Sequence, residues 1–387
     1  MAHVVTNQPC EKILLVAIDF PPVSGGISVF IYNLWRYFPE DRIVILAPFD
    51  KAAAQFDKKQ KFRVYRTEKA RTKSLTGKLF TILDLMFATR SIIKKENICE
   101  LHCLHLASLG IIGYLHRLFN RIEYYTYVFG AEFTINKKLN LIQKIVLNKS
   151  KGIIVISEFS KSLLIKMGVK NNNIIKAAPG VDSEKFSPKL NYTEIIDKYN
   201  LDDKKVILTV SRLAPNKGCD TAIEVLPLIL KEIPNAVYII GGTGPSEEEL
   251  KELVVKMDLE DKVIFTGYIP DEELSSYYNL SDAFLLLTRE IKDKGNVEGF
   301  GMVFIEAGAC ETPVVGGRTG GTPEAIVDGI TGYLVDPLDL EEISEALIKL
   351  LTNESRARKM GIEGRQRARK EFRWPQRAKE LWGAIRE

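Results

Sequence analysis

The feature of this sequence that most constrains its fold is a repeated alternation of short apolar runs with longer stretches of helical character. The apolar runs predict strands at Ile13–Ile18, Ile43–Ala47, Tyr124–Val128, Ile153–Ile156, Val206–Val210, Val237–Ile240, Val263–Thr266, Ala283–Leu287 and Pro313–Val315. Continuous β-branched runs of this length are typical of strands that are buried on both faces. Because helical stretches separate most of them, the sequence predicts an α/β fold with parallel sheets covered on both sides by helices.

The alternation restarts near residue 205, so the chain is expected to form two domains. Its 387 residues agree with two units of about 150–200 residues each. We predict an N-terminal domain over residues 1–180, a linker region over 181–204 and a C-terminal domain over 205–370. Two doubly wound domains place a cleft between the carboxyl ends of their strands. Residues 371–387 predict a final helix with two tryptophans on one face, and this helix is expected to pack back towards the N-terminal domain.

The two halves of the chain carry opposite net charges. Residues 1–200 contain 30 Lys and Arg against 17 Asp and Glu, a net charge of +13, whereas residues 201–387 contain 24 against 33, a net charge of −9. Such a split suggests that the halves meet different partners. The five scattered cysteines suit reduced thiols, and the sequence shows neither a signal peptide nor an apolar run of about 18 residues. A cytoplasmic location is therefore expected.

Basic residues are concentrated in residues 58–95, where they alternate with apolar side chains. Two interpretations stay open. The first is a core helix over residues 75–95 with solvated lysines, and the second is attachment to an anionic membrane surface, where each basic residue contributes about 1 kcal/mol. On the second interpretation the protein is peripheral on the inner face of the membrane. Nucleic acid is not expected as a partner, because no aromatic side chains are interleaved as platforms for bases and the second half is acidic.

Two carboxylates, Glu298 and Glu306, stand eight positions apart around the turn Gly299-Phe300-Gly301, which leads into a helix of small and apolar residues. Glycines let a backbone approach a ligand closely, and the amino end of the helix that follows favours an anion. The flanking carboxylates can accept hydrogen bonds from hydroxyl groups. A phosphate flanked by hydroxyl groups describes a nucleotide sugar.

Two cations, Arg212 and Lys217, follow the predicted strand Val206–Val210. The carboxyl ends of strands are where open α/β sheets bind their ligands. A planar guanidinium and a mobile ammonium both suit a diphosphate, although solvated surface cations in a loop would have the same sequence.

We expect no metal ion in this site. No Asp-x-Asp triplet occurs in the sequence, and positive charge from Arg212 and Lys217 can replace a metal. One apolar segment does combine potential metal ligands, but their spacing matches no common zinc signature. These residues are Cys99, His102, Cys103 and His105.

Three further turns follow predicted strands and are candidates for a donor site or for plain tight turns. Gly25-Gly26 precedes a helix directly, as in a phosphate or sugar cradle. Gly242 belongs to Gly241–Pro245, which lacks the G-x-G-x-x-G spacing of a dinucleotide loop. Tyr268 and Ile269 follow a strand at a position where their backbone groups would face a base.

In their order along the chain these motifs resemble the retaining glycosyltransferases of family 4, which have the GT-B fold of two Rossmann-like doubly wound domains facing a cleft. The resemblance covers nearly the whole chain and is strongest over residues 205–340. The long loop of residues 289–297 is similar to that of the phosphatidylinositol mannoside mannosyltransferase branch, which uses GDP-mannose, whereas related branches use UDP-sugars. The motifs are Arg212 with Lys217-Gly218, Glu298–Glu306, Gly320-Gly321-Thr322-Pro323-Glu324, Gly332-Tyr333-Leu334-Val335, Pro179-Gly180-Val181-Asp182 and Gly25-Gly26.

The resemblance implies transfer of a hexose, of mannose or glucose type, from a nucleotide diphosphate sugar to a hydroxyl group of a sugar or lipid-linked acceptor. It implies retention of anomeric configuration and no cofactor, with the acceptor on the first domain and the donor on the second. Arg212, Lys217 and Glu298 are the implied catalytic residues: the cations stabilise the diphosphate, and Glu298 accepts hydrogen bonds from the donor sugar. We expect a front-face mechanism, in which the leaving diphosphate takes the acceptor's proton.

The same resemblance implies a wider set of donor-binding residues. Glu306 would accept hydrogen bonds from the ribose, and the N–H groups of Met302 and Val303 would face the diphosphate. Gly25 and Gly26 would close over the donor from the other domain. The full set is Gly25, Gly26, Gly242, Tyr268, Ile269, Gly299, Phe300, Gly301, Met302, Val303 and Glu306.

One position departs from the family pattern. Family members often carry a His-Gly-x-Glu segment after a strand of the first domain, where this chain has Phe129-Gly130-Ala131-Glu132. A phenylalanine cannot hydrogen-bond a hydroxyl group, so a catalytically silent sugar-nucleotide-binding protein stays open as an alternative. Two others are a nucleotide-sugar-processing enzyme of the same architecture, such as an epimerase, and a nicotinamide oxidoreductase, which the missing G-x-G-x-x-G argues against.

Overall fold

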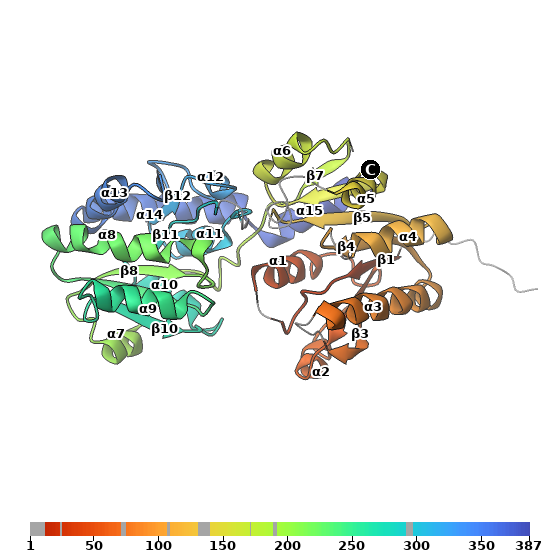
Figure 1. Ribbon diagram of the computed structural model, residues 1–387, viewed down its shortest axis with the longest axis horizontal. Coiled ribbons are helices and arrows are strands. Elements are labelled where there is room, and N and C mark those ends of the chain that lie inside the picture. The colour runs from red at the N-terminus through yellow and green to blue at the C-terminus, as the bar shows by residue number, and fades with distance from the viewer. Residues whose placement is uncertain are drawn as a thin grey trace, which may run out of the picture.

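The computed structural model contains two parallel β-sheets, each with helices on both faces (Figure 1). It describes residues 12–23, 25–70, 75–106, 109–130, 140–170, 172–188, 192–291 and 297–387, without the side chains of residues 68–70 and 75–79. The strand pairs are parallel in both sheets, for example with Ile13 beside Ile43 and Val206 beside Val237. The α/β fold with two doubly wound domains is therefore confirmed.

The first sheet has seven strands and forms the N-terminal domain. Its strands, in spatial order, are β3 (Arg63–Ala70), β2 (Ile43–Phe49), β1 (Lys12–Val16), β4 (Ile98–Leu104), β5 (Glu123–Val128), β6 (Gly152–Val155) and β7 (Ile174–Lys176). Its helices are α1 (Gly26–Trp35), α2 (Ala53–Asp57), α3 (Leu75–Glu96), α4 (Gly110–Asn120), α5 (Leu141–Lys149) and α6 (Glu158–Lys166).

The second sheet has six strands and forms the C-terminal domain. Its strands, in spatial order, are β10 (Val263–Gly267), β9 (Ala236–Gly241), β8 (Lys205–Val210), β11 (Ala283–Leu286), β12 (Val314–Gly317) and β13 (Gly332–Val335). Its helices are α7 (Thr193–Tyr199), the short 3-10 helix η2 (Pro215–Lys217), α8 (Cys219–Glu232), α9 (Glu247–Lys256), α10 (Leu274–Leu280), α11 (Met302–Ala309), α12 (Thr322–Ala325), α13 (Leu340–Thr352) and α14 (Glu354–Glu371).

All strands predicted from the sequence are present, but β3, β4, β7 and β13 were not among them. Strands β3, β7 and β13 lie at sheet edges, where partial exposure removes the continuous apolar run. The central strand β4 was obscured by two buried polar residues, Glu100 and His102. These two side chains satisfy each other through a 3.1 Å contact between His102 Nε2 and Glu100 Oε1.

The chain ends in helix α15 (Trp374–Ala384), which crosses back to the first domain and packs beside α1 (Figure 1). Trp374 meets Phe30 with ring centroids 5.9 Å apart, and Trp382 meets Phe38 at 5.0 Å. The two segments that cross between the domains lie side by side, because the N–H group of Val181 donates to the carbonyl oxygen of Phe372 over 2.6 Å. Aromatic burial of this kind makes the last helix part of the first domain's core.

Candidate active site

A cavity of about 280 Å³ lies between the domains, at the carboxyl ends of both sheets. The first domain contributes the start of α1, the residues that follow β5 and β6, and Pro179. The second domain contributes the β8–α8 loop and the segment that leads into α11. The cavity is lined by Gly26, Ile27, Phe30, Phe129, Ile156, Pro179, Arg212, Ala214, Asn216, Lys217, Val297, Glu298, Gly299, Phe300, Gly301 and Met302.

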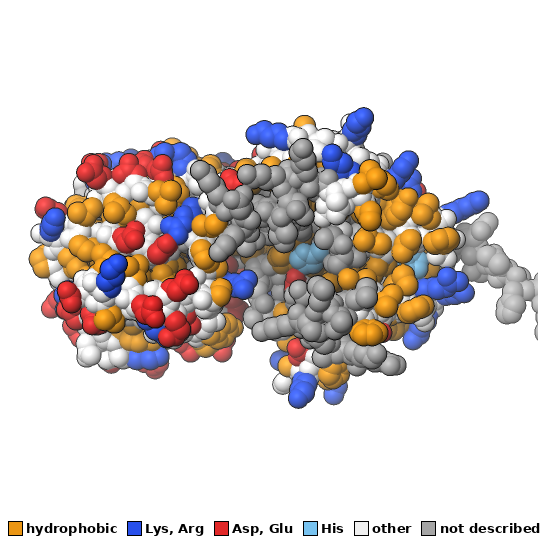
Figure 2. All heavy atoms as spheres, viewed as in Figure 1, with side chains coloured by type: hydrophobic (Ala, Val, Ile, Leu, Met, Phe, Trp, Pro, Cys, Tyr) orange, Lys and Arg blue, Asp and Glu red, His pale blue; other side chains and the backbone are white. Residues whose placement is uncertain are grey.

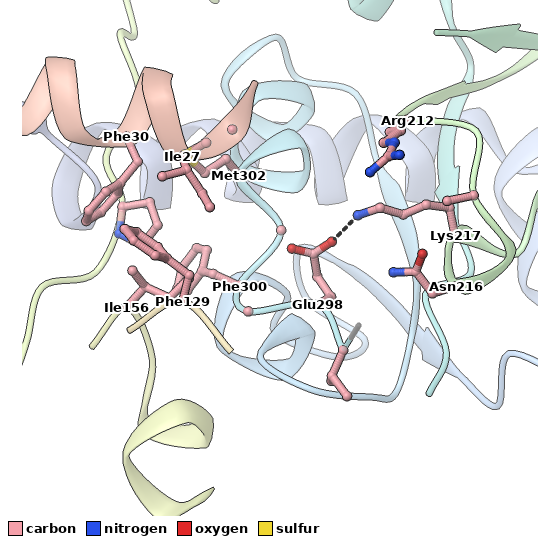
Figure 3. A pocket seen from close by; sticks show the side chains of 16 residues that line it. Ile27, Phe30, Phe129, Ile156, Arg212, Asn216, Lys217, Glu298, Phe300 and Met302 are labelled. Atoms are coloured by element: carbon pink, nitrogen blue, oxygen red, sulfur yellow. Dashed lines mark hydrogen bonds and ion pairs between the residues drawn. The ribbon is translucent and has the colours of Figure 1, made fainter. Parts of the chain in front are cut away.

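An ion pair joins Lys217 and Glu298 in the second-domain wall, with Nζ 2.6 Å from Oε2 (Figure 3). Burial by itself would raise the pKa of the Glu298 carboxyl group. The charge and hydrogen bond of Lys217 and the N–H groups of Phe300 and Gly301 outweigh burial, so the pKa lies below its usual value. Glu298 is therefore ionised at neutral pH. Its charge balances the ammonium group of Lys217, which the sequence predicts to bind a diphosphate.

Arg212 is exposed and points towards Lys217 from the β8–α8 loop (Figure 3). The neighbouring β9–α9 loop fixes this segment, because the N–H group of Leu213 donates to the carbonyl oxygen of Thr243 over 3.0 Å. Gly242 has a φ of 123°, and a side chain there would overlap the carbonyl oxygen of Ser211. Gly242 thus supports the loop of Arg212 and does not line the cavity.

The two domains touch through backbone at the floor of the cavity. A side chain at Gly299 would overlap the carbonyl oxygen of Phe129 and crowd Ile156 of the first domain. Gly301 has a φ of 89° and begins α11 in a left-handed conformation that glycine adopts without strain. Gly299, predicted to let the backbone approach a ligand, thus lets the two domains approach each other.

Two protein-family models match consecutive parts of the chain. Residues 24–185 match the model described as Glycosyltransferase Family 4, and residues 191–367 match the model described as Glycosyl transferases group 1. The GDP-mannose-dependent alpha-(1-6)-phosphatidylinositol monomannoside mannosyltransferase of Mycolicibacterium smegmatis is 30% identical over 375 residues, which is 95% of this chain and 96% of that protein. The chain belongs to glycosyltransferase family 4. It is a hexosyltransferase, and these relatives do not support the epimerase or silent-binding alternatives.

Solved structures show the same GT-B fold at low sequence identity. Sucrose-phosphate synthase from Thermosynechococcus elongatus superposes with a TM-score of 0.81 at 20% identity, over 97% of this chain and 98% of that one. Anabaena HepE in complex with UDP and glucose gives 0.80 at 17% identity, over 97% and 99% of the two chains. The fold of the glycosyltransferase is thus shared over nearly its whole length.

Glu306 lies on α11 outside the cavity lining, where its Oε2 accepts a hydrogen bond from the Tyr278 hydroxyl group over 3.0 Å. Burial raises the pKa of this carboxyl group to about 7, and the hydrogen bond from Tyr278 offsets only part of the shift. Of the charged groups nearby, Lys185 lowers this pKa and Asp271 raises it. The protonation state of Glu306 consequently changes near neutral pH.

The other predicted donor residues divide between the cavity and its surroundings. Gly26 lines the cavity, and a Cβ there would lie 3.5 Å from the Met302 side chain of the second domain. Gly25 is the N-cap of α1. Tyr268 is 64% exposed after β10, whereas Ile269 is buried. The structure therefore places Gly25, Tyr268, Ile269, Val303 and Glu306 outside the cavity lining and Gly299, Phe300, Gly301 and Met302 within it.

Three residues near the site have no role assigned to them in the sequence analysis. Asn216 lines the cavity beside Lys217 (Figure 3). Arg289 fixes the base of that loop, because its N–H group donates to the carbonyl oxygen of Asn216 and its Nη1 to the Thr221 hydroxyl group over 2.6 Å. Glu324 joins the domains by accepting a hydrogen bond from the Phe159 N–H group at the start of α6, over 3.1 Å. Glu324 belongs to a named motif and Arg289 to the named loop, but only the fold shows what these residues contact.

The possible zinc cluster does not form. Cys103 and His102 are neighbours on β4, so their side chains point to opposite faces of the sheet. Among the described residues no group of three or more His, Cys, Asp or Glu side chains could hold a metal ion. In the part of the chain that the structure describes, no helix is long and apolar enough to cross a membrane.

Proposed function

We propose that this glycosyltransferase moves mannose from GDP-mannose to a hydroxyl group of a sugar or lipid-linked acceptor, with retention of configuration and without a divalent metal. The observation that carries the proposal is the Lys217–Glu298 pair at the interdomain cavity, with Arg212 beside it. The choice of donor is supported by the Mycolicibacterium smegmatis relative, which is named as GDP-mannose-dependent. Residues 292–296 of the loop that resembles that branch lie outside the described residues.

Donor binding exchanges one partner of Lys217 for another. In the structure, the ammonium group of Lys217 is neutralised by Glu298. A diphosphate that enters the cavity takes over Lys217 and Arg212, and the released carboxylate accepts hydrogen bonds from the sugar hydroxyl groups. The pair thus holds both side chains in place before the donor arrives, which lowers the cost of ordering them.

In the transfer step the bond between the anomeric carbon and the β-phosphate oxygen breaks, and the acceptor oxygen bonds to the same face of that carbon. The acceptor's proton passes to the departing phosphate oxygen, so no protein nucleophile is needed. Negative charge grows on the diphosphate as the bond breaks, and Lys217, Arg212 and the amino end of α11 stabilise it.

A donor panel tests this proposal. We expect GDP-mannose to give nucleotide diphosphate release that depends on an alkyl mannoside or inositol phospholipid acceptor, in excess chelator, with the α-anomer retained by NMR. UDP-glucose and UDP-N-acetylglucosamine serve as matched donors. Preferred transfer from a UDP-sugar would overturn the donor assignment, and loss of activity in chelator with rescue by magnesium would overturn the metal-independent step.

We also propose that the first domain attaches to an anionic membrane surface through a patch on α3, α4 and α5. Figure 2 shows hydrophobic side chains gathered over this end of the first domain, with Lys and Arg at the margin. Phe87 is 66% exposed, Phe119 77% and Leu141 74%, which is unusual for large apolar side chains. Exposed cations flank them at Arg90, Lys94, Arg121 and Lys149. Aromatic anchors and basic residues together are the features of interfacial membrane attachment.

Vesicle sedimentation tests the membrane patch. We expect the protein to bind vesicles that contain phosphatidylglycerol and to bind phosphatidylcholine alone at least about tenfold more weakly. Phe87→Ser with Phe119→Ser should abolish binding, whereas Val255→Ser, at an apolar position on α9 of the second domain that is 58% exposed, should not. Equal binding of both vesicle types, or equal loss in the control, would contradict the proposal.

A further inference from the structure

Among the residues that the structure describes, those of the first domain that line the cavity are almost all apolar. They are Gly26, Ile27, Phe30, Phe129, Ile156 and Pro179. The cations and the carboxylate that suit the donor all belong to the second domain, so the acceptor approaches along the apolar side. Hydroxyl groups that leave water need hydrogen-bond partners. An acceptor with several hydroxyl groups therefore requires polar side chains next to this wall.

A histidine–carboxylate pair lies next to the apolar wall that the first domain contributes to the cavity. Asp19 follows β1 and His105 follows β4, and because these strands are neighbours their carboxyl ends meet at the same edge of the sheet. His105 Nε2 is 2.7 Å from Asp19 Oδ2, and each side chain is 20% exposed, so solvent and ligands can reach both. The imidazole ring also lies against Phe129, with ring centroids 5.8 Å apart. Phe129 itself lines the cavity, which places the pair one ring away from it.

The backbone at His105 has an unusual conformation. Its φ is 76°, in the left-handed region that few non-glycine residues occupy. Its carbonyl oxygen accepts hydrogen bonds from the N–H groups of Leu109 and Gly110, both over 3.2 Å, at the start of α4. Strained residues of this kind cluster at ligand sites, where surrounding structure holds them in place.

We propose that His105 and Asp19 form an acceptor subsite that binds the hydroxyl groups of a sugar-like ring lying against Phe129. This inference rests on the proposed function and names a part of the acceptor's binding site. Asp19 orients the imidazole, and the carboxylate and the ring together form the polar edge that meets the hydroxyl groups of the acceptor. Both are acceptor-positioning residues, and neither exchanges a proton in the transfer step.

Three variants test the subsite. His105→Asn removes the ring and keeps a side chain that tolerates a positive φ, Asp19→Asn removes the charge at equal size, and the third variant combines both. Asp203→Asn is the matched control, because Asp203 also has a positive φ, of 57°, and lies in the second domain. We expect His105→Asn to raise the KM for an alkyl mannoside at least tenfold while the Kd for GDP-mannose stays within twofold. The KM of the double variant should lie within twofold of the higher KM of the two single variants, because the two side chains act as one unit.

Direct binding separates this inference from the proposed function. Saturation-transfer NMR of octyl mannoside, octyl glucoside and inositol phospholipid vesicles reports acceptor binding to the GDP-loaded enzyme without any transfer. Reduced signals in the variants, with wild-type signals in Asp203→Asn, support the subsite even if the donor assignment fails. Wild-type signals in all variants, no signal from any acceptor, or a parallel loss of GDP-mannose binding would overturn the subsite.

Discussion

The two walls of the interdomain cavity differ in charge, and the difference does not follow the net charges of the two halves of the chain. The basic half supplies the apolar wall, and the acidic half supplies the cations. The half with a net charge of +13 presents Ile27, Phe30, Phe129 and Ile156, whereas the half with a net charge of −9 presents Arg212, Lys217 and the carboxylate of Glu298. Net charge therefore says little about a site, because a few placed side chains decide the local field. The comparison teaches a division of roles. On the proposed function, the second domain neutralises the leaving group, and the first excludes water and receives the acceptor.

Removing a cation from the charged wall should have the largest effect. Lys217→Ala and Arg212→Ala are each expected to lower kcat about 10²-fold or more, through lost stabilisation of the charge that grows on the diphosphate. Lys251→Ala, which removes an exposed lysine of the same domain, should leave kcat within about twofold. Steady-state kinetics with GDP-mannose measure both. Rates within twofold of wild type in both cation variants would remove the basis for the diphosphate assignment.

Forcing the two walls apart should have the next largest effect. Gly299→Ala places a methyl group against the carbonyl oxygen of Phe129, so the domains must separate for it to fit. We expect kcat/KM to fall about tenfold or more, since a small misplacement of the reacting groups is costly. Gly383→Ala on α15, where a methyl group meets open space, is the matched control. Small-angle scattering should show a more open molecule for Gly299→Ala alone, and unchanged scattering with full activity would contradict this account.

The pH dependence of donor binding tests the predicted contact between Glu306 and the ribose. Glu306 has a pKa raised to about 7, so it loses its proton as pH rises through 7 and then accepts hydrogen bonds from hydroxyl groups more strongly. The Kd for GDP-mannose should therefore fall about tenfold between pH 6 and pH 8, as expected for a single group that must be ionised. Titration calorimetry of wild type and Glu306→Gln measures this, and the variant should show a flat profile. An equal slope in both proteins would exclude Glu306.

The smallest effect is expected at the hydrogen bond that joins the domains beside the cavity. Glu324→Gln keeps an acceptor for the Phe159 N–H group but removes the charge and its attraction for Lys176, whose Nζ is 3.6 Å from Oε2. We expect the KM for donor to rise about two- to threefold, because partly exposed ion pairs contribute little. Glu345→Gln on α13 should change nothing. A tenfold rise would show that this contact governs domain closure.

The sequence predicts the fold better than it predicts the wall of the first domain. Doubly wound sheets follow from continuous apolar runs, because burial on both faces leaves a strong signal, and the edge strands β3, β7 and β13 lack it. Arg212, Lys217 and Glu298 could be placed together because each follows a strand whose carboxyl end faces the cleft. Asp19 and His105 could not be paired from the sequence, because they depend on β1 and β4 being neighbours, and β4 was not predicted. The contact of Glu324 with Phe159 depends on how two domains dock, which no local pattern encodes.

The hydrogen bond between Val181 and Phe372 pins the outgoing and returning segments of the chain to each other where they pass between the domains. Because the two crossing segments are paired at one point, this point is suited to act as the hinge between the domains. Such a hinge allows rotation of one domain against the other, whereas sliding of one domain past the other would break the hydrogen bond. We expect any opening of the domains to be a rotation about this point, which would return the donor sugar and the acceptor to the same relative position when the domains close.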